Sequence, residues 1–127
     1  MKTYDINTFR DLEVYQLAFS FQQSIFRLSQ GFPREETFSL TDQVRRSSRA
    51  IGANIAESWA KRRYPAHFLS KLTDADGELQ ESSHWLATAH DCGYLAPEQV
   101  EALFSICTGI GGKLGGMMAK HEKFCLR

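Results

Sequence analysis

Six cations in one segment are the residues best suited to binding a ligand. Arg45 and Arg49 are four residues apart and therefore share a helix face, whereas Arg46 lies about 100° round from Arg45. Lysine and arginine side chains neutralise the phosphates of a nucleic-acid backbone. The candidate nucleic-acid-binding residues are therefore Arg45, Arg46, Arg49, Lys61, Arg62 and Arg63.

The alternative is that these cations form ion pairs with acidic residues, within one subunit or between subunits. Residues 74–101 carry carboxylates but no lysine or arginine. The whole chain has 15 basic and 15 acidic residues and an isoelectric point near 6.9, whereas a dedicated nucleic-acid domain usually lies above about 9. This balance of charge favours ion pairing.

Three carboxylates form one stripe on the acidic segment. Asp74, Glu78 and Glu81 recur at i, i+4 and i+7, and Lys71 stands three residues before Asp74, where the two can pair. A hard cation takes about six oxygen ligands, which one helix cannot supply. We expect these carboxylates to pair across an interface or to remain solvated, and not to bind a metal.

No complete catalytic or cofactor-binding set is present in the sequence. Glu81 and His84 form a single Glu-x-x-His, whereas a di-iron bundle needs that motif on two helices. Cys92 follows His90 and Asp91, but neighbouring residues on a helix point in different directions, so a buried structural thiol is expected. The sequence therefore predicts no enzyme activity, no catalytic residue, no metal and no cofactor.

Two polar residues interrupt the apolar second half of the basic segment. Asn54 lies one turn from Ala50 and Ser58, small residues that let another helix come close. A polar binding site and a packing role both fit Asn54 and Glu57. Because buried polar residues can fix helix register, the role in packing or ring register is favoured.

Glycines are dense between Gly109 and Gly116. Their spacing does not match a phosphate-binding loop, which needs a following Lys-Ser/Thr pair. Each glycine in a helix costs roughly 1 kcal/mol relative to alanine. Either another helix approaches this face closely, or the segment frays or bends.

Four predicted helices position these residues. The apolar residues recur with a helical period, and the three prolines lie at segment boundaries. We expect Ser39 to cap the second helix and Gly93 to cap the third. The helices are expected over residues 9–30, 39–63, 65–92 and 97–120. Because the connections are short, the prediction is an all-α, antiparallel up-down-up-down four-helix bundle.

Length and composition limit the class of protein. The 127 residues fit a single domain spanning residues 1–127, and 43% hydrophobic content argues against disorder. Apolar runs are short and the N-terminal segment has no signal-like stretch, so we expect neither a membrane partner nor secretion. Three cysteines without a Cys-x-x-Cys pair indicate reduced thiols and a cytoplasmic location.

The first predicted helix has more apolar surface than one bundle requires. Its apolar residues spread over roughly 220°, whereas a core-facing stripe needs little more than about 100°. The surplus favours a second burial partner, most simply another copy of the chain. A wide core filled by large aromatic side chains is the alternative.

Short motifs follow one another in a distinctive order along residues 9–125. They are Asp11-Leu12-Glu13-Val14-Tyr15, Leu40-Thr41-Asp42-Gln43-Val44-Arg45-Arg46, Asn54-Ile55-Ala56-Glu57, Phe68-Leu69, Asp74-Ala75-Asp76, Trp85-Leu86, Cys92-Gly93-Tyr94-Leu95 and Leu114-Gly115-Gly116-Met117. In this order they resemble the four-helix-bundle 23S rRNA intervening-sequence proteins, relatives of the accessory proteins of diversity-generating retroelements. Ser58 replaces the family's usual glycine and His67 its usual acidic residue, and neither departure touches the core pattern.

The resemblance implies an up-down-up-down bundle that assembles into a ring, commonly a pentamer. Some members are encoded inside intervening sequences of bacterial 23S rRNA genes. In the retroelement relatives, a strongly basic pentamer engages a reverse transcriptase and nucleic acid. For most members no activity is established, and the zero net charge of this chain departs from the basic relatives.

The sequence thus predicts a non-enzymatic homo-oligomer, a pentamer by resemblance, whose basic second helix binds RNA, another nucleic acid or a nucleic-acid-processing protein. The alternative is a protein–protein adaptor or scaffold with no nucleic-acid role, in which the charged helices serve ring assembly. The candidate packing and interface residues are Asn54, Glu57, Asp74, Glu78 and Glu81.

Overall fold

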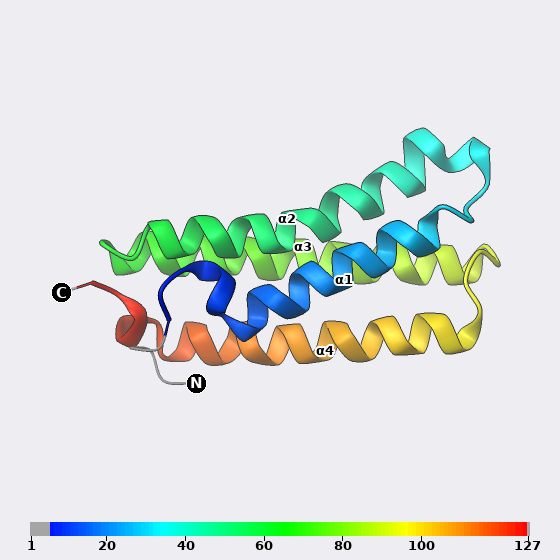
Figure 1. Cartoon of the computed structure of the whole chain (residues 1–127). Coiled ribbons are helices and arrows are strands. Elements are labelled where there is room, and N and C mark those ends of the chain that lie inside the picture. Colours follow the sequence, from blue (N-terminus) through cyan, green and yellow to red (C-terminus); the bar gives the residue numbers. More distant parts are fainter. Residues whose placement is uncertain (1–5, 127) are drawn as a thin grey trace.

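The computed structural model describes residues 6–126 as four long helices that lie side by side (Figure 1). Their bounds are α1 (Glu13–Ser29), α2 (Asp42–Ala60), α3 (Pro65–Asp91) and α4 (Pro97–Ala119). Short turns flank them: η2 (Phe9–Asp11), η3 (Arg34–Glu36), the π-helical turn η4 (Thr37–Thr41) and η5 (His121–Phe124). No strand occurs among the described residues, and the predicted all-α four-helix bundle is confirmed.

Consecutive helices run in opposite directions (Figure 1). Each helix packs against the next, and α4 closes the bundle against α1. Contacts between α2 and α3 follow this arrangement, since Ser47 near the start of α2 meets Ser82 at 2.8 Å and Glu57 near its end meets Lys71 at 2.8 Å. The outer groove between α1 and α2 therefore faces away from the outer groove between α3 and α4.

Backbone chemistry sets most helix ends where the sequence predicts them. Pro65 and Pro97 occupy the first positions of α3 and α4, where a missing N–H costs nothing. Gly93 follows α3 with φ of 83°, a conformation that glycine adopts without steric cost. The predicted ends of the third and fourth helices are thus confirmed to within a residue.

The starts of α1 and α2 differ from the prediction. A short 3-10 turn covers Phe9–Asp11, and the extended backbone of Leu12 (ψ 127°) separates it from α1, which begins at Glu13. Ser39 does not cap α2. It lies inside the π-helical turn and donates to Glu36 Oε1 at 2.7 Å, while the Glu36 carboxylate accepts from the Leu40 N–H. The carboxylate is the stronger acceptor and takes the capping role.

The core is a column of apolar side chains contributed by all four helices. From α1 come Val14, Ala18, Phe21 and Ile25. Phe21 meets a core that also holds Phe68, and both side chains are fully buried. Burying a side chain of this size contributes about 1.5–3 kcal/mol, so the α1 stripe is a major source of stability.

Helix α4 is continuous through its glycines, so the alternative that the segment frays there is wrong. A Cβ added at Gly111 would meet Leu79 Cδ2 at 3.5 Å. At Gly109, Gly112 and Gly115 no atom of the described chain, apart from the adjoining backbone of α4 itself, lies within 4 Å of that position. Close helix approach within the chain therefore explains Gly111 and none of these three.

By length and composition, α4 is also able to cross a membrane, with a mean hydropathy of 1.2 in its most apolar window. This corrects the expectation drawn from short apolar runs, because scattered isoleucine, leucine, phenylalanine and methionine side chains, with few charged residues between them, raise the mean. The helix packs its buried side chains against α1 and α3, and 28% of that window is buried. A mostly buried core helix passes the same test, but most of this window is not buried within the described chain.

Candidate functional site

Arg46 pairs within the chain, with the acidic stripe of α3. Its Nη1 lies 3.2 Å from Glu78 Oε2, and its Nη2 contacts Glu81. The Trp85 indole donates to Glu81 Oε2 at 3.0 Å. This hydrogen bond and the Arg46 guanidinium lower the pKa of Glu81, and the same contact raises the pKa of Arg46. Arg46 thus serves the α2–α3 contact, as the ion-pairing alternative predicts.

Arg45 and Arg49 lie on the other side of α2, against α1. Their guanidinium carbons stand 4.8 and 5.5 Å from the centroid of the Phe26 ring. Arg45 Nε also donates to Ser29 Oγ at 2.8 Å. Neither arginine forms an ion pair with a carboxylate of residues 6–126. These two cations remain open to an anionic ligand or to a partner's carboxylates.

The remaining predicted cations lie at the far end of α2, about 18 Å from Arg49 at 1.5 Å per residue. Arg62 stacks on Trp59 at 3.7 Å and donates to the Trp59 carbonyl at 2.8 Å, and burial lowers its pKa. Lys61 and Arg63 are exposed. The six cations therefore do not form one patch.

Glu57 and Asp74 meet at Lys71. Lys71 Nζ lies 2.8 Å from Glu57 Oε2 and 3.7 Å from Asp74 Oδ2, so the predicted Lys71–Asp74 pair is present and Glu57 is the nearer partner. The Lys71 ammonium lowers the pKa of Glu57. Asn54 donates to the Ala50 carbonyl of its own helix at 2.9 Å. The Lys71–Glu57 pair holds the end of α2 against the start of α3, whereas the Lys71–Asp74 pair lies within α3.

Cys92 is exposed, and the prediction of a buried thiol there is wrong. It follows the last residue of α3, in the turn that leads to Gly93, where no helix covers it. Cys107 is the buried cysteine, and burial raises its pKa to about 11. Within residues 6–126, no group of three or more histidine, cysteine, aspartate or glutamate side chains is placed to hold a metal ion.

An aromatic groove runs between α1 and α2. Tyr15 lies across Gly52, where an added Cβ would meet the ring at 3.5 Å, and Phe9 packs edge-on against Tyr15 at 4.8 Å. Phe19 is 47% exposed beside them. The groove encloses a cavity of about 280 Å³ lined by Phe9, Tyr15, Phe19, Gln22, Arg49, Gly52, Ala53 and Ala56. This is the surplus apolar surface expected of the first helix.

An acidic groove runs between α3 and α4, on the opposite side of the bundle. Its cavity of about 290 Å³ is lined by Leu79, Gln80, Ser83, Phe104, Cys107, Thr108 and Gly111. Asp76 and Glu101 lie one helical turn from lining residues of α3 and α4. Neither carboxylate pairs with a cation among the residues that the structure describes. The lining of this groove therefore combines apolar and polar side chains, and its edge is negative.

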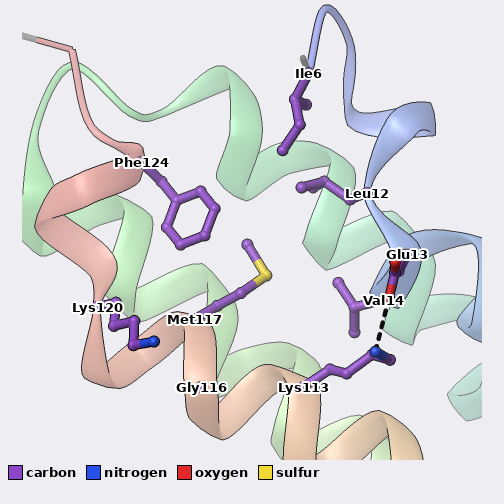
Figure 2. Close-up of a pocket in the computed structure, with 9 residues that line it drawn as sticks. All are labelled: Ile6, Leu12, Glu13, Val14, Lys113, Gly116, Met117, Lys120 and Phe124. Carbon is purple, nitrogen blue, oxygen red and sulfur yellow. Dashed lines mark hydrogen bonds and ion pairs between the residues drawn. The ribbon is translucent and has the colours of Figure 1, made fainter. Parts of the chain in front are cut away.

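The two ends of the described chain meet at a third cavity, of about 260 Å³ (Figure 2). Ile6 and Leu12 lie on one side of it, and Met117 and Phe124 on the other. Lys113 Nζ lies 2.8 Å from a carboxylate oxygen of Glu13 at the rim, and this contact lowers the pKa of Glu13. The ion pair ties the start of α1 to the end of α4.

Another cavity lies where α1 ends and α2 begins, and sequence analysis did not find it. In the sequence, its charge marks Arg45 as a candidate binding residue, but no charge or motif marks Ser29 or Thr41, which line the same cavity. The only local indication for Thr41 is that it lies four residues before Arg45, and therefore on the same helix face. The contact of Arg45 with Ser29 joins residues 16 positions apart, which no local pattern reveals.

The fold and its surfaces define an all-α four-helix bundle with open grooves on two opposite sides. The pattern of the 23S rRNA-intervening sequence protein family matches residues 10–116, and the chain belongs to this family. The resemblance drawn from the sequence motifs is confirmed.

A solved structure of a protein of unknown function from the S23 ribosomal protein family of Bacteroides thetaiotaomicron is similar in fold. It aligns with a TM-score of 0.75 and 28% sequence identity over 84% of this chain and 95% of that chain. No curated protein matches the chain. Neither the family description nor that of the solved relative names an enzymatic activity.

Proposed function

We propose that this protein is a non-enzymatic scaffold that assembles into a closed homo-oligomeric ring, with five copies as the family resemblance implies. The proposal rests on the exposure of Phe19, a large aromatic side chain that is 47% exposed in the aromatic groove. The acidic groove on the opposite side offers a cavity to receive it, in which Leu79 and Phe104 supply apolar surface. A second copy of the chain is thus the occupant that both grooves fit.

Charge supports the same pairing. Arg49 lines the aromatic groove, and Asp76 and Glu101 flank the acidic one. Because the two grooves are different surfaces on opposite sides, a contact between them is heterologous, and heterologous contacts form a ring when the rotation closes. Opposite charges at the edges of such a contact fix its register and orientation. The chain's zero net charge then reflects two complementary sides.

The proposed location is the cytoplasm. All three cysteines are free, including the exposed Cys92. Exposed free thiols persist where the compartment is reducing.

Native mass spectrometry of the full chain tests the assembly. The wild-type protein is expected as a multimer of five copies, and Phe19→Glu as a monomer, because the substitution places a charge against the apolar surface of the acidic groove. Ser20→Glu is the matched control, since it adds the same charge to the next residue, on the exposed polar face of α1, and should leave the multimer intact. A wild-type monomer would overturn the proposal.

A charge-swap pair tests which surfaces meet. Arg49→Glu should weaken the multimer, and Glu101→Arg in the same chain should restore part of it, because the reversed pair attracts again. Restoration by Glu101→Arg supports the contact between the two grooves. A stable multimer that ignores Phe19→Glu and both charge changes would place the interface elsewhere.

RNA binding is a second candidate, and Arg45 and Arg49 favour it, because both lack a carboxylate partner among residues 6–126 and stand beside an aromatic ring. Filter binding of single-stranded RNA across a salt series tests it. Replacing either arginine by glutamine should reduce the slope of log K against log salt by about 0.7 for each phosphate that the arginine neutralises. An unchanged slope would exclude phosphate binding at these positions.

A further inference from the structure

A cavity of about 360 Å³ opens between the end of α1 and the start of α2. This volume lies in the range of about 300–1,000 Å³ typical of small-molecule sites. Phe26 and Phe32 supply apolar walls, and the rest of the lining is polar, from Ser29, Gln30, Thr37, Thr41 and Arg45. Small-molecule sites combine apolar walls with polar groups that fix the orientation of the ligand.

Arg45 is held in one orientation at this cavity. Its Nε donates to Ser29 Oγ at 2.8 Å, and the Ser29 hydroxyl, which is nearly fully buried, donates to the Phe26 carbonyl at 3.0 Å. The guanidinium also lies over the Phe26 ring at 4.8 Å. Its two Nη groups have no hydrogen-bond acceptor among residues 6–126. A fixed guanidinium fork of this kind matches the paired oxygens of a carboxylate or phosphate.

Thr41 adds an independent observation. It lines the cavity one helical turn before Arg45, and only 7% of its surface is exposed. Its Oγ1 is buried and has no hydrogen-bond partner within the described chain. A buried hydroxyl without a partner costs about 1–3 kcal/mol. Threonine in a helix takes either of two χ1 rotamers, so a rotation can turn this hydroxyl towards an anion held by Arg45.

The backbone around Thr41 is unusual in the same place. Thr37–Thr41 form a π-helical turn, and both of its end residues line the cavity. A π-helical turn inserts one residue into the helix and so changes the direction of the side chains that precede α2. Such turns are frequent at functional sites. The turn sets Thr41 and Arg45 on the wall that faces Ser29.

We propose that this cavity binds a small organic oxyanion, a carboxylate or a phosphate monoester, through the Arg45 guanidinium and the Thr41 hydroxyl, with the apolar part of the ligand against Phe26 and Phe32. Every residue of the site comes from one chain. The cavity lies about two helical turns along α1 from Phe19. The site is therefore complete without a second copy of the chain, and the proposal does not require ring assembly.

Isothermal titration calorimetry of the full chain tests the site with four probes. Phenyl phosphate and benzoate carry the oxyanion and an aromatic body, inorganic phosphate lacks the body, and benzyl alcohol lacks the charge. We expect saturable binding of phenyl phosphate, benzoate or both, at one site per chain, and weaker binding of the other two probes. The preferred oxyanion probe then separates a phosphate ligand from a carboxylate ligand.

Three variants locate the binding. Arg45→Gln should weaken the preferred probe at least tenfold, and Thr41→Val about tenfold, because each removes a hydrogen bond to an ionised group. Thr41→Val should also raise the melting temperature of the unliganded protein, because it removes the unpaired hydroxyl at nearly constant shape. Thr73→Val is the matched control, on the exposed face of α3, and should leave binding unchanged.

The proposal is overturned if neither oxyanion probe binds, or if Arg45→Gln and Thr41→Val bind as the wild type does while circular dichroism shows both folded. Binding of a short RNA without binding of either oxyanion probe would overturn it as well, and would assign Arg45 to a macromolecular ligand. The oligomeric state is recorded for each variant. A variant that loses probe binding but keeps the oligomeric state of the wild type supports binding in this cavity, whether or not that state is a ring.

Discussion

Replacing three glycines of α4 by alanine should make the fold substantially more stable. Gly109, Gly112 and Gly115 lie inside a continuous helix, and an added Cβ at any of them meets no atom of the described chain within 4 Å, apart from the adjoining backbone of α4 itself. Glycine costs about 0.8–1 kcal/mol relative to alanine in a helix interior. The triple substitution should therefore raise the free energy of unfolding by about 2.5–3 kcal/mol, provided the three effects add.

The corresponding change in melting temperature is large enough to measure easily. At about 4 °C per kcal/mol for a chain of this length, the triple variant should melt about 10–12 °C higher than the wild type. Circular dichroism with urea and thermal unfolding measures both quantities. Each single substitution should contribute about a third of the total.

Two other glycines serve as controls. Gly111→Ala places a methyl group 3.5 Å from Leu79, an ordinary contact, and should gain a similar amount. Gly93→Ala should destabilise the protein by about 1 kcal/mol or more, because its φ of 83° strains any residue with a Cβ.

The oligomeric state decides what a failure means. If the three alanines stabilise the fold and leave the multimer intact, this face of α4 is open, as the structure indicates. If they destabilise the protein or dissociate the multimer, a neighbouring chain lies against the glycines, and the reasoning from an open face is refuted.

Three further predictions concern ionisable groups. A double-mutant cycle of Arg46→Met and Glu81→Gln should give a coupling in the free energy of unfolding of about 0.2–1 kcal/mol, because both side chains are more than a third exposed. A coupling near zero would show that the pair is not formed in solution. Because the folded-state pKa of Glu81 is lowered, the stability that its contacts provide is present above the unfolded pKa and should be lost as pH falls through the folded pKa. In acid unfolding curves, Glu81→Gln should abolish this part of the pH dependence. In the native protein, a maleimide should label the exposed Cys92 quickly. It should label Cys107 only at the rate of global or local opening, because that thiol is buried and burial raises its pKa to about 11. Mass spectrometry of timed samples measures both rates.

The parts of the fold that the sequence predicts are those fixed by local backbone chemistry. Pro65, Pro97 and Gly93 mark helix ends whatever surrounds them, and the structure confirms all three. The extended backbone of Leu12 and the π-helical turn before α2 have no comparable local signal. Local side-chain contacts hold both segments, with the Asp11 carboxylate on the Thr8 N–H and the Glu36 carboxylate on Ser39, but the helical period of the apolar residues does not reveal them. The predicted starts of α1 and α2 are therefore wrong.

For the candidate site too, the sequence predicts some features and misses others. The helical angle between Arg45 and Arg46 separates them on the sequence alone, and in the structure one faces α1 and the other faces α3. The partners of each arginine are long-range, because Ser29 and Glu81 come from other helices. Sequence analysis therefore identifies which cations matter, but not that Arg46 is already paired or that Arg45 borders a cavity.

The meeting of the two chain ends has a consequence for how the protein can be used and displayed. Ile6 and Phe124 line one cavity at the same end of the bundle (Figure 2). A short linker across this end can join them, and a new opening in the connection between α3 and α4 then leaves every helix intact, which are the conditions under which circular permutation succeeds. In a ring with cyclic symmetry, these ends recur on a single rim. Any domain fused to either end of the chain would then be presented, in several copies, on one face of the assembly.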